Sequence, residues 1–265
     1  MTARKSAGTL LLLAALTTAG PLAQTGPKQV LWTFDRLDEI GGLKTTIEGH
    51  PKLVDTLVGR AIEFDGVDDG IWIEQHPLAG ADTFTFEAIF RPDGGGFAQR
   101  WFHLAERDPV TGLLASPDHA TTGQDANARM LFELRAVGDS WYLDAWVSGP
   151  GYRRALMFKD KLHPIGAWYH VAQTFDGRMF RSYVNGVLQG EAEIAFKPQG
   201  EGAASVGTRI NRQSYFKGAV RQARFTHSAL TPDQFLTIGV PAQAVGLRQA
   251  SAPTLPCDVA TRAGD

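Results

Sequence analysis

The sequence of 265 residues is poor in the groups that carry most metal and redox chemistry. Its one cysteine, Cys257, cannot form an internal disulfide, so the fold must depend on the packing of its core. No HExxH, CxxC or His-x-His pattern suggests zinc. A G-x-S-x-G nucleophile elbow and a phosphate-binding Gly-Lys-Ser/Thr loop are also missing. The commonest signatures of metallohydrolases, serine hydrolases and nucleotide-binding proteins are therefore excluded.

The sequence also lacks an excess of charge of one sign. Lys and Arg together number 26 and Asp and Glu number 28, which gives a formal net charge of −2. Domains that bind nucleic acid or a membrane surface usually carry a clear positive excess. We therefore expect no nucleic-acid partner. Hydrophobic residues make up 43% of the chain, which is enough for the core of one large domain.

The first 23 residues have the pattern of a secretory signal peptide. Arg4 and Lys5 precede an apolar run at 10–16, and small residues follow it. The run is too short to span a bilayer, and we expect cleavage between positions 19 and 24. The sequence therefore predicts a secreted or periplasmic protein that has no membrane span after the signal peptide is removed.

Long helical patterns are nearly absent, whereas turn signals are frequent. Asp176-Gly177 and Asn185-Gly186 lie nine residues apart, between residues that favour strands. Asp-Gly and Asn-Gly supply the positive φ angles of tight hairpin turns, so residues 168–194 are predicted to form three consecutive antiparallel strands. Residues 83–91, 130–136 and 141–147 alternate between apolar and polar, which is typical of half-buried strands. Trp32 and Trp101 are expected in the core.

One short helix is predicted near the C-terminus. Thr231 can cap it, Pro232 suits its first position, and Gln234 completes a capping box. Residues 239–265 are rich in Ala, Pro and Gly and are expected to form a flexible tail. The expected organisation is therefore a signal peptide at 1–23, a domain at 28–238 and this tail.

Four segments together resemble the laminin G-like jelly rolls of the concanavalin A-like lectin/glucanase superfamily. AIEFDGVDDGIWI at 61–73 is similar to their "FDG…D" hairpin, and TFTFEAIFRP at 83–92 to the strand that follows. WYHVAQTFDGRMFRSYVNGVLQG at 168–190 resembles their central meander, and FKGAVRQARFTHSALT at 216–231 resembles their closing strand and helix start. The order and spacing agree over about residues 30–236. The resemblance implies an all-β fold, a two-sheet antiparallel jelly-roll sandwich with one short C-terminal helix.

Relatives of this kind bind glycans, bind proteins, hold calcium or cleave polysaccharides, so the fold does not select a function. The β-glucan hydrolases among them carry a Glu-x-Asp-x-x-Glu cluster on one strand, where alternate carboxylates converge on a sugar bond. This sequence has no such cluster, because Arg135 follows Glu133 where the second acid belongs. We therefore expect a non-catalytic module that binds extracellular glycan. A protein-interaction or surface-assembly domain and a polysaccharide-active enzyme with an atypical acid pair are the alternatives.

Polar and aromatic side chains lie opposite the apolar ones along several predicted strands. Glycan sites use aromatic faces for sugar CH groups and planar polar side chains for hydroxyls. If the strands share one sheet, these side chains form a strip on its outer face. The alternative is a solvated sheet face with salt bridges. The candidate ligand-binding residues are Glu87, Glu133, Arg135, Tyr142, Asp144, Trp146 and His170.

A cluster of acids suggests a second candidate site. Asp65, Asp68 and Asp69 offer the hard oxygen ligands that calcium prefers. The same residues are also typical of turns, in which their side chains bond to nearby N–H groups. Many relatives carry an acidic pair where this sequence has Arg221-Gln222, and a positive side chain there would repel a cation. The sequence requires no cofactor and leaves calcium open.

Overall fold

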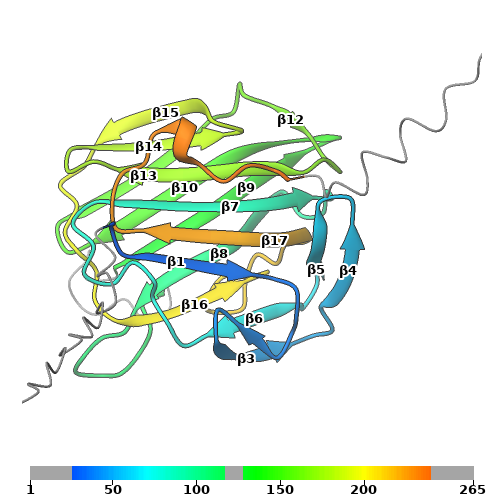
Figure 1. Ribbon diagram of the computed structural model, residues 1–265, viewed down its shortest axis with the longest axis horizontal. Helices are drawn as coiled ribbons and strands as arrows, with labels where there is room; N and C mark the ends of the chain where they lie inside the picture. Colours follow the sequence, from blue (N-terminus) through cyan, green and yellow to red (C-terminus); the bar gives the residue numbers. More distant parts are fainter. Residues whose placement is uncertain (1–25, 117–127, 240–265) are drawn as a thin grey trace, which may run out of the picture.

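The computed structural model describes residues 26–116 and 128–239. The expected signal peptide at 1–23, the tail beyond residue 239 and Cys257 lie outside the described residues. The described part consists of two antiparallel sheets and a single 3-10 turn. In Figure 1, β7 and β17 lie in front and β8, β9 and β10 lie behind them. Among the described residues, no helix is long and apolar enough to cross a membrane.

The first sheet has the order β15-β14-β13-β7-β17-β5-β4, with β1 also paired to β17. Its members are β1 (Gln29–Thr33), β4 (Lys52–Thr56), β5 (Gly59–Asp65), β7 (Phe84–Pro92), β13 (Tyr169–Phe175), β14 (Met179–Val184), β15 (Val187–Glu193) and β17 (Lys217–Thr226).

The second sheet has the order β11-β10-β9-β8-β16-β6-β3-β2, with β12 paired to β10. Its members are β2 (Glu39–Ile40), β3 (Leu43–Glu48), β6 (Gly70–Ile73), β8 (Ala98–Glu106), β9 (Arg129–Val137), β10 (Ser140–Gly149), β11 (Tyr152–Met157), β12 (His163–Pro164) and β16 (Gly202–Val206).

The two predicted hairpin turns form as expected. β13, β14 and β15 pair as consecutive antiparallel strands. Gly177 has a φ of 100°, and the pair Asn185 and Gly186 has φ values of 49° and 76°. Positive φ at both central residues matches the right-handed twist of a hairpin. The expected jelly-roll architecture of two antiparallel sheets is therefore confirmed.

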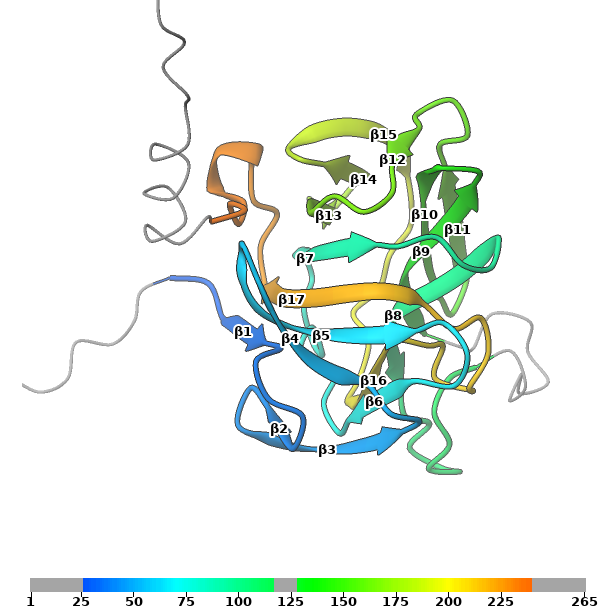
Figure 2. The same cartoon turned by 90° about the vertical axis from the view of Figure 1, so that its right-hand side faces the viewer.

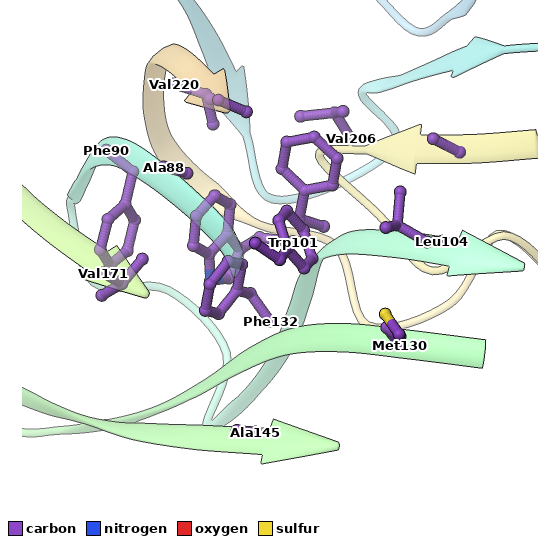
Figure 3. Close-up of a cluster of buried hydrophobic side chains, with 14 of the residues drawn as sticks. Ala88, Phe90, Trp101, Leu104, Met130, Phe132, Ala145, Val171, Val206 and Val220 are labelled. Carbon is purple, nitrogen blue, oxygen red and sulfur yellow. The ribbon is translucent and has the colours of Figure 1, made fainter. Parts of the chain in front are cut away.

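The core lies between the sheets and is rich in stacked aromatic rings. Trp101 of β8 stacks on Phe90 of β7 at a centroid distance of 4.3 Å and on Phe132 of β9 at 5.4 Å. Figure 3 shows these side chains converging from strands of both sheets. Trp32 and Trp101 are fully buried, as expected. The inward halves of the alternating strands therefore supply the packing that holds the two layers together.

The segment 61–73 differs from the expected hairpin. β5 pairs with β4 and β17 in the first sheet, whereas β6 pairs with β3 and β16 in the second. The link between them crosses from one layer to the other. The carboxylate of Asp69 fixes this crossing, because it accepts hydrogen bonds from the backbone N–H groups of His50 at 2.6 Å and Asp65 at 2.9 Å.

The expectation that residues 83–91 form a half-buried strand is wrong, because β7 is buried on both faces. Its outward-facing Thr85, Glu87 and Ile89 are fully buried. Thr85 and Glu87 are covered by the chain that follows β17, residues 228–238, which we call the C-terminal segment. It contains the predicted helix only as the three-residue 3-10 turn η2 (Pro232–Gln234).

Candidate functional site

The structure divides the expected polar strip between two surfaces. β7 and β13, which carry Glu87 and His170, belong to the first sheet. β9 and β10, which carry Glu133 and Trp146 among others, belong to the second. Figure 2 shows the C-terminal segment beside β13 and β14, with β9, β10 and β11 on the far side of the sandwich. The strip therefore does not form as one surface, because its strands do not share a sheet.

Glu87 and His170 belong to a buried network under the C-terminal segment. One Glu87 oxygen lies 2.7 Å from His170 Nε2 and accepts a hydrogen bond from the backbone N–H of Leu236 at 2.8 Å. The other accepts a hydrogen bond from Nε of Arg224. Phe235 packs on the His170 ring at a centroid distance of 5.2 Å. This network holds the C-terminal segment on the first sheet and leaves neither predicted residue exposed to a ligand.

The remaining candidates surround a hollow on the outer face of the second sheet. The hollow has a volume of about 200 Å³ and lies across β8, β9, β10 and β11. We call it the Trp146 pocket. It is lined by Arg100, Arg129, Leu131, Glu133, Arg135, Asp144, Trp146, Ala155, Met157 and Arg209. The structure thus brings Glu133, Arg135, Asp144 and Trp146 together.

Two carboxylates and two arginines are bonded together beside this hollow. Glu133 and Asp144 are cross-strand partners on β9 and β10. Arg135 donates to Asp144 at 2.6 Å and to Glu133 at 3.3 Å. Arg100 donates to Glu133 at 3.0 Å and to the hydroxyl of Ser214 at 2.7 Å. These charge-assisted bonds fix the four side chains in place.

Burial changes the proton affinity of both acids. It raises the pKa of Glu133 to about 7, against the opposing effect of Arg100, and the nearby Asp144 charge raises it further. Burial also raises the pKa of Asp144, while Arg135 opposes the shift. Because two neighbouring carboxylates resist ionising together, Glu133 holds its proton up to a pH of about 7.

Trp146 is the aromatic surface of the pocket. Its indole N–H donates to the hydroxyl of Ser148 at 3.2 Å, which sets the orientation of the ring. The guanidinium groups of Arg129 from β9 and Arg153 from β11 each lie 5.7 Å from the ring centroid. The side chain is half-buried, so part of the ring remains open to solvent. An aromatic ring flanked by planar donors is the combination that sugar binding needs.

Tyr142 is the one predicted residue of β10 that does not join the pocket. It lies on the same face as Asp144 and Trp146 but is only 4% exposed. Its hydroxyl is therefore poorly placed to meet a ligand.

The acidic cluster forms at the crossing between β5 and β6. Carboxylate oxygens of Asp65, Asp68 and Asp69 lie within 4.8 Å of one another. Asp69 uses both oxygens on backbone N–H groups, and Asp65 accepts hydrogen bonds from the backbone of Val67 at 2.7 Å and Asp68 at 3.4 Å. Lys217 is the cross-strand partner of Asp65. Asp65 and Asp69 thus stabilise the turn through hydrogen bonds to its backbone, and calcium binding stays a prediction.

Sequence reasoning missed Arg100, Arg129 and Arg209. Arg100 lies at a register shift between β8 and β9, where alternation no longer tells which face a residue occupies. Arg129 precedes the alternating run 130–136 by one position, so extending that run would have included it. Arg209 lies outside the named strands, and no local pattern marks it.

Two antiparallel sheets with a polar and aromatic hollow on one outer face define a jelly-roll sandwich with a candidate binding site outside its core. A laminin G family model, described as the concanavalin A-like lectin/glucanases superfamily, matches residues 65–235. The chain belongs to this family, as the motifs indicated. No curated protein matches the sequence.

Solved structures of low sequence identity share the fold. Domain 4 of AbnA, a GH43 extracellular arabinanase from Geobacillus stearothermophilus in complex with arabinotriose, has a TM-score of 0.56 and 20% identity, over 79% of this chain and 97% of that chain. The binding domain of Paraclostridial Mosquitocidal Protein 1 has a TM-score of 0.52 and 11% identity, over 78% and 50%. A botulinum neurotoxin type C structure has a TM-score of 0.50 and 9% identity, over 77% and 49%. This chain thus spans about half the length of the latter two.

Proposed function

We propose that the protein is an exported glycan-binding module and that the sugar binds in the Trp146 pocket. The observation that carries this proposal is the half-buried indole of Trp146, which has two guanidinium groups 5.7 Å from its ring centroid. The ring offers an apolar face for sugar CH groups. The side chain of Arg135 is held in place by Asp144 and offers further donors for hydroxyls.

The ligands of two of the structural neighbours belong to the proposed ligand class, because they contain sugars. AbnA domain 4 was solved with arabinotriose, and cell entry of botulinum neurotoxin type C depends upon interaction with two ganglioside molecules. Both ligands contain sugars. At such low sequence identity, the neighbours support only a shared fold. The assignment of the pocket therefore depends on the residues of this chain.

The geometry of the acid pair favours binding over glycoside hydrolysis. The two carboxyl groups of a glycosidase lie about 5 to 10 Å apart, on either side of the bond that is cleaved. Glu133 and Asp144 instead lie directly opposite each other on neighbouring strands. Arg135 donates a hydrogen bond to both of them, and Arg100 donates one to Glu133. A sugar cannot enter between them without breaking these bonds.

A glycan array tests the proposal directly. The mature protein is applied with and without a chelator, beside a Trp146→Ala variant. We expect binding to at least one glycan and a loss of about tenfold or more in Trp146→Ala, because stacking on an aromatic ring contributes on the order of 1 kcal/mol or more. A calcium requirement would appear as a loss in chelator.

Trp168→Ala is the matched control. Trp168 is also half-buried and also has an arginine, Arg91, 5.5 Å from its ring centroid, but it lies outside the pocket. We expect this variant to bind as the unaltered protein does. Binding to no glycan in either condition would remove the proposal. Mass spectrometry of the secreted protein tests export, with a new N-terminus expected between positions 19 and 24.

A further inference from the structure

Contacts between arginine and an aromatic ring recur in this protein, and most of the arginines are neutralised. Arg91 over Trp168 pairs with Asp93 at 2.7 Å and Glu63 at 3.1 Å. In two further contacts between an arginine and a ring, the arginine also bonds to an acid. Arg212 over Trp72 bonds to Glu48 at 2.7 Å, and Arg135 over Phe97 bonds to Asp144 at 2.6 Å. An acid next to the guanidinium is therefore the rule for these contacts.

Trp146 is the exception among the residues that the structure describes. Neither Arg129 nor Arg153 forms an ion pair within residues 26–116 and 128–239, although both lie against this ring. Nε of Arg129 is buried and has no hydrogen-bond acceptor there. A buried donor that lacks an acceptor is costly, and native proteins keep few of them. This cost points to an acceptor that is not among residues 26–116 and 128–239, and a bound ligand can supply it.

The register explains why the two arginines meet. Ser148 of β10 lies opposite Arg129 of β9 on one side and opposite Arg153 of β11 on the other. Trp146 is two residues away on the same face of β10, so both guanidinium groups reach its ring. The three strands thus fix two positive groups around one aromatic surface, independently of any loop.

The carboxylates of the pocket form their ion pairs with other arginines and not with Arg129 or Arg153. Arg100 and Arg135 already bond to Glu133 and Asp144, and burial raises the pKa of Glu133 to about 7, which reduces its negative charge near neutral pH. Burial, and after it the neighbouring positive charge of Arg209, lowers the pKa of Arg129 to about 10, while Glu133 opposes the shift. The chain as a whole carries a formal net charge of −2, so the positive pocket is a local feature.

We propose that the Trp146 pocket takes an anionic sugar, whose ring lies against Trp146 and whose carboxylate or sulfate group is bound by Arg129 and Arg153. This inference rests on the proposed glycan-binding function and adds the charge of the ligand. Guanidinium groups bind planar or tetrahedral oxyanions through paired N–H donors. A hollow of about 200 Å³ with one aromatic ring suits a single acidic sugar unit better than a nucleic-acid strand.

The first experiment is an array that contains neutral, uronate-containing and sulfated glycans. We expect the bound glycans to carry a carboxylate or a sulfate. Calorimetry then compares a bound glycan with its carboxyl-reduced or desulfated counterpart, which separates the two sources of charge. The neutral counterpart should bind at least about tenfold more weakly, and salt should weaken binding of the anionic form.

Two neighbouring arginines provide the matched variants. Arg153 and Arg154 are both exposed and lie on opposite faces of β11, and Arg154 donates to the backbone carbonyl of Glu193 at 3.3 Å. Arg153→Gln should weaken binding of the anionic glycan about tenfold, whereas Arg154→Gln should leave it unchanged. Because both side chains are at the surface, neither change should prevent folding.

The possible failures are distinguishable. Trp146-dependent binding that is equal for the anionic glycan and its neutral counterpart would overturn this inference and leave the proposed function standing. Unchanged affinity in both Arg153→Gln and Arg129→Gln would also overturn it. Binding to no glycan of any charge would remove the proposed function and this inference together.

Discussion

On the outer face of the first sheet Glu87 is fully buried beneath the C-terminal segment, whereas on the outer face of the second sheet Trp146 remains partly open. Every partner of Glu87 comes from the chain itself: His170, Arg224 and the backbone of Leu236. Arg129 beside Trp146 has no such acceptor among the described residues. A polar group that the fold covers must be satisfied by the fold, whereas a group at an open surface can be completed by a ligand. The first face therefore serves stability, and the second is the better place to seek function.

The largest expected effect is a loss of stability when the buried network of the covered face is disrupted. Glu87→Ala should lower the free energy of unfolding by about 3–5 kcal/mol, because it leaves Arg224 and a backbone N–H without their buried acceptor. Urea denaturation measures this loss. Glu193→Ala is the control, since Glu193 pairs with Arg178 at the surface, where both side chains are more than half exposed. We expect a change below about 1 kcal/mol there, and equal losses in both variants would contradict the comparison.

The second prediction concerns pH and the open face. Because burial raises the pKa of Glu133 to about 7, above its ordinary value of 4.5, the folded state binds this proton more tightly than the unfolded chain does. The resulting stabilisation is fully present below about pH 4.5 and is lost as the pH rises through about 7, with a total of at most about 3 kcal/mol. Denaturation curves from pH 4 to 8 should show this fall, and Glu133→Gln should remove it. A stability difference between the two proteins that is constant over this range would refute the assignment.

The third prediction returns to the covered face at the turn beside the C-terminal segment. Gly186 has a φ of 76°, and an added Cβ would lie 3.9 Å from Pro232. Gly186→Val should cost about 2 kcal/mol, because a β-branched side chain resists positive φ. Thermal melting tests this cost. Gly96→Val is the control, since that glycine has no positive φ and no atom within 4 Å of the added Cβ. Similar melting temperatures for the two variants would count against the hairpin.

The smallest expected effect is a difference between two aromatic truncations. Phe235→Ala removes the ring that covers His170 and Tyr183 and should cost about 2 kcal/mol of stability. Trp146→Ala should cost about 1 kcal/mol less, because its ring is partly open, while it weakens the proposed sugar binding about tenfold or more. Calorimetric unfolding measures the stability of each variant, and a glycan-binding assay measures its affinity for sugar. The opposite order of stabilities would mean that Trp146 is mainly a packing residue.

The parts of the fold that follow from local chemistry could be predicted from the sequence. The turns at Asp176-Gly177 and Asn185-Gly186 require positive φ, and the inward alternation of 141–147 follows from the two-residue period of a strand. The choice of sheet for each strand could not be predicted. β5 and β6 flank one short turn yet pair in different layers, because their partners β17 and β16 lie far away in the chain.

The candidate site was predicted in part for the same reason. Glu133, Arg135, Asp144 and Trp146 share a face because β9 and β10 are joined by a short hairpin. Glu87 and His170 were separated from them by long-range pairing and were then covered by the C-terminal segment. Arg100 was hidden by the register shift in β8. Local alternation therefore identifies which side chains point outward, but not which of them stay uncovered.

Residues 26–29 and the C-terminal segment line one surface together, next to Arg224 and Thr226 of β17. Figure 2 shows that both lie on the side of the sandwich opposite β9, β10 and β11. A tether attached before residue 26 or after residue 239 would therefore attach to the surface opposite β9, β10 and β11. The Trp146 pocket would then face away from the support. For immobilised binding assays, a tag at either end should leave the pocket accessible, whereas random coupling through surface lysines would not guarantee that orientation.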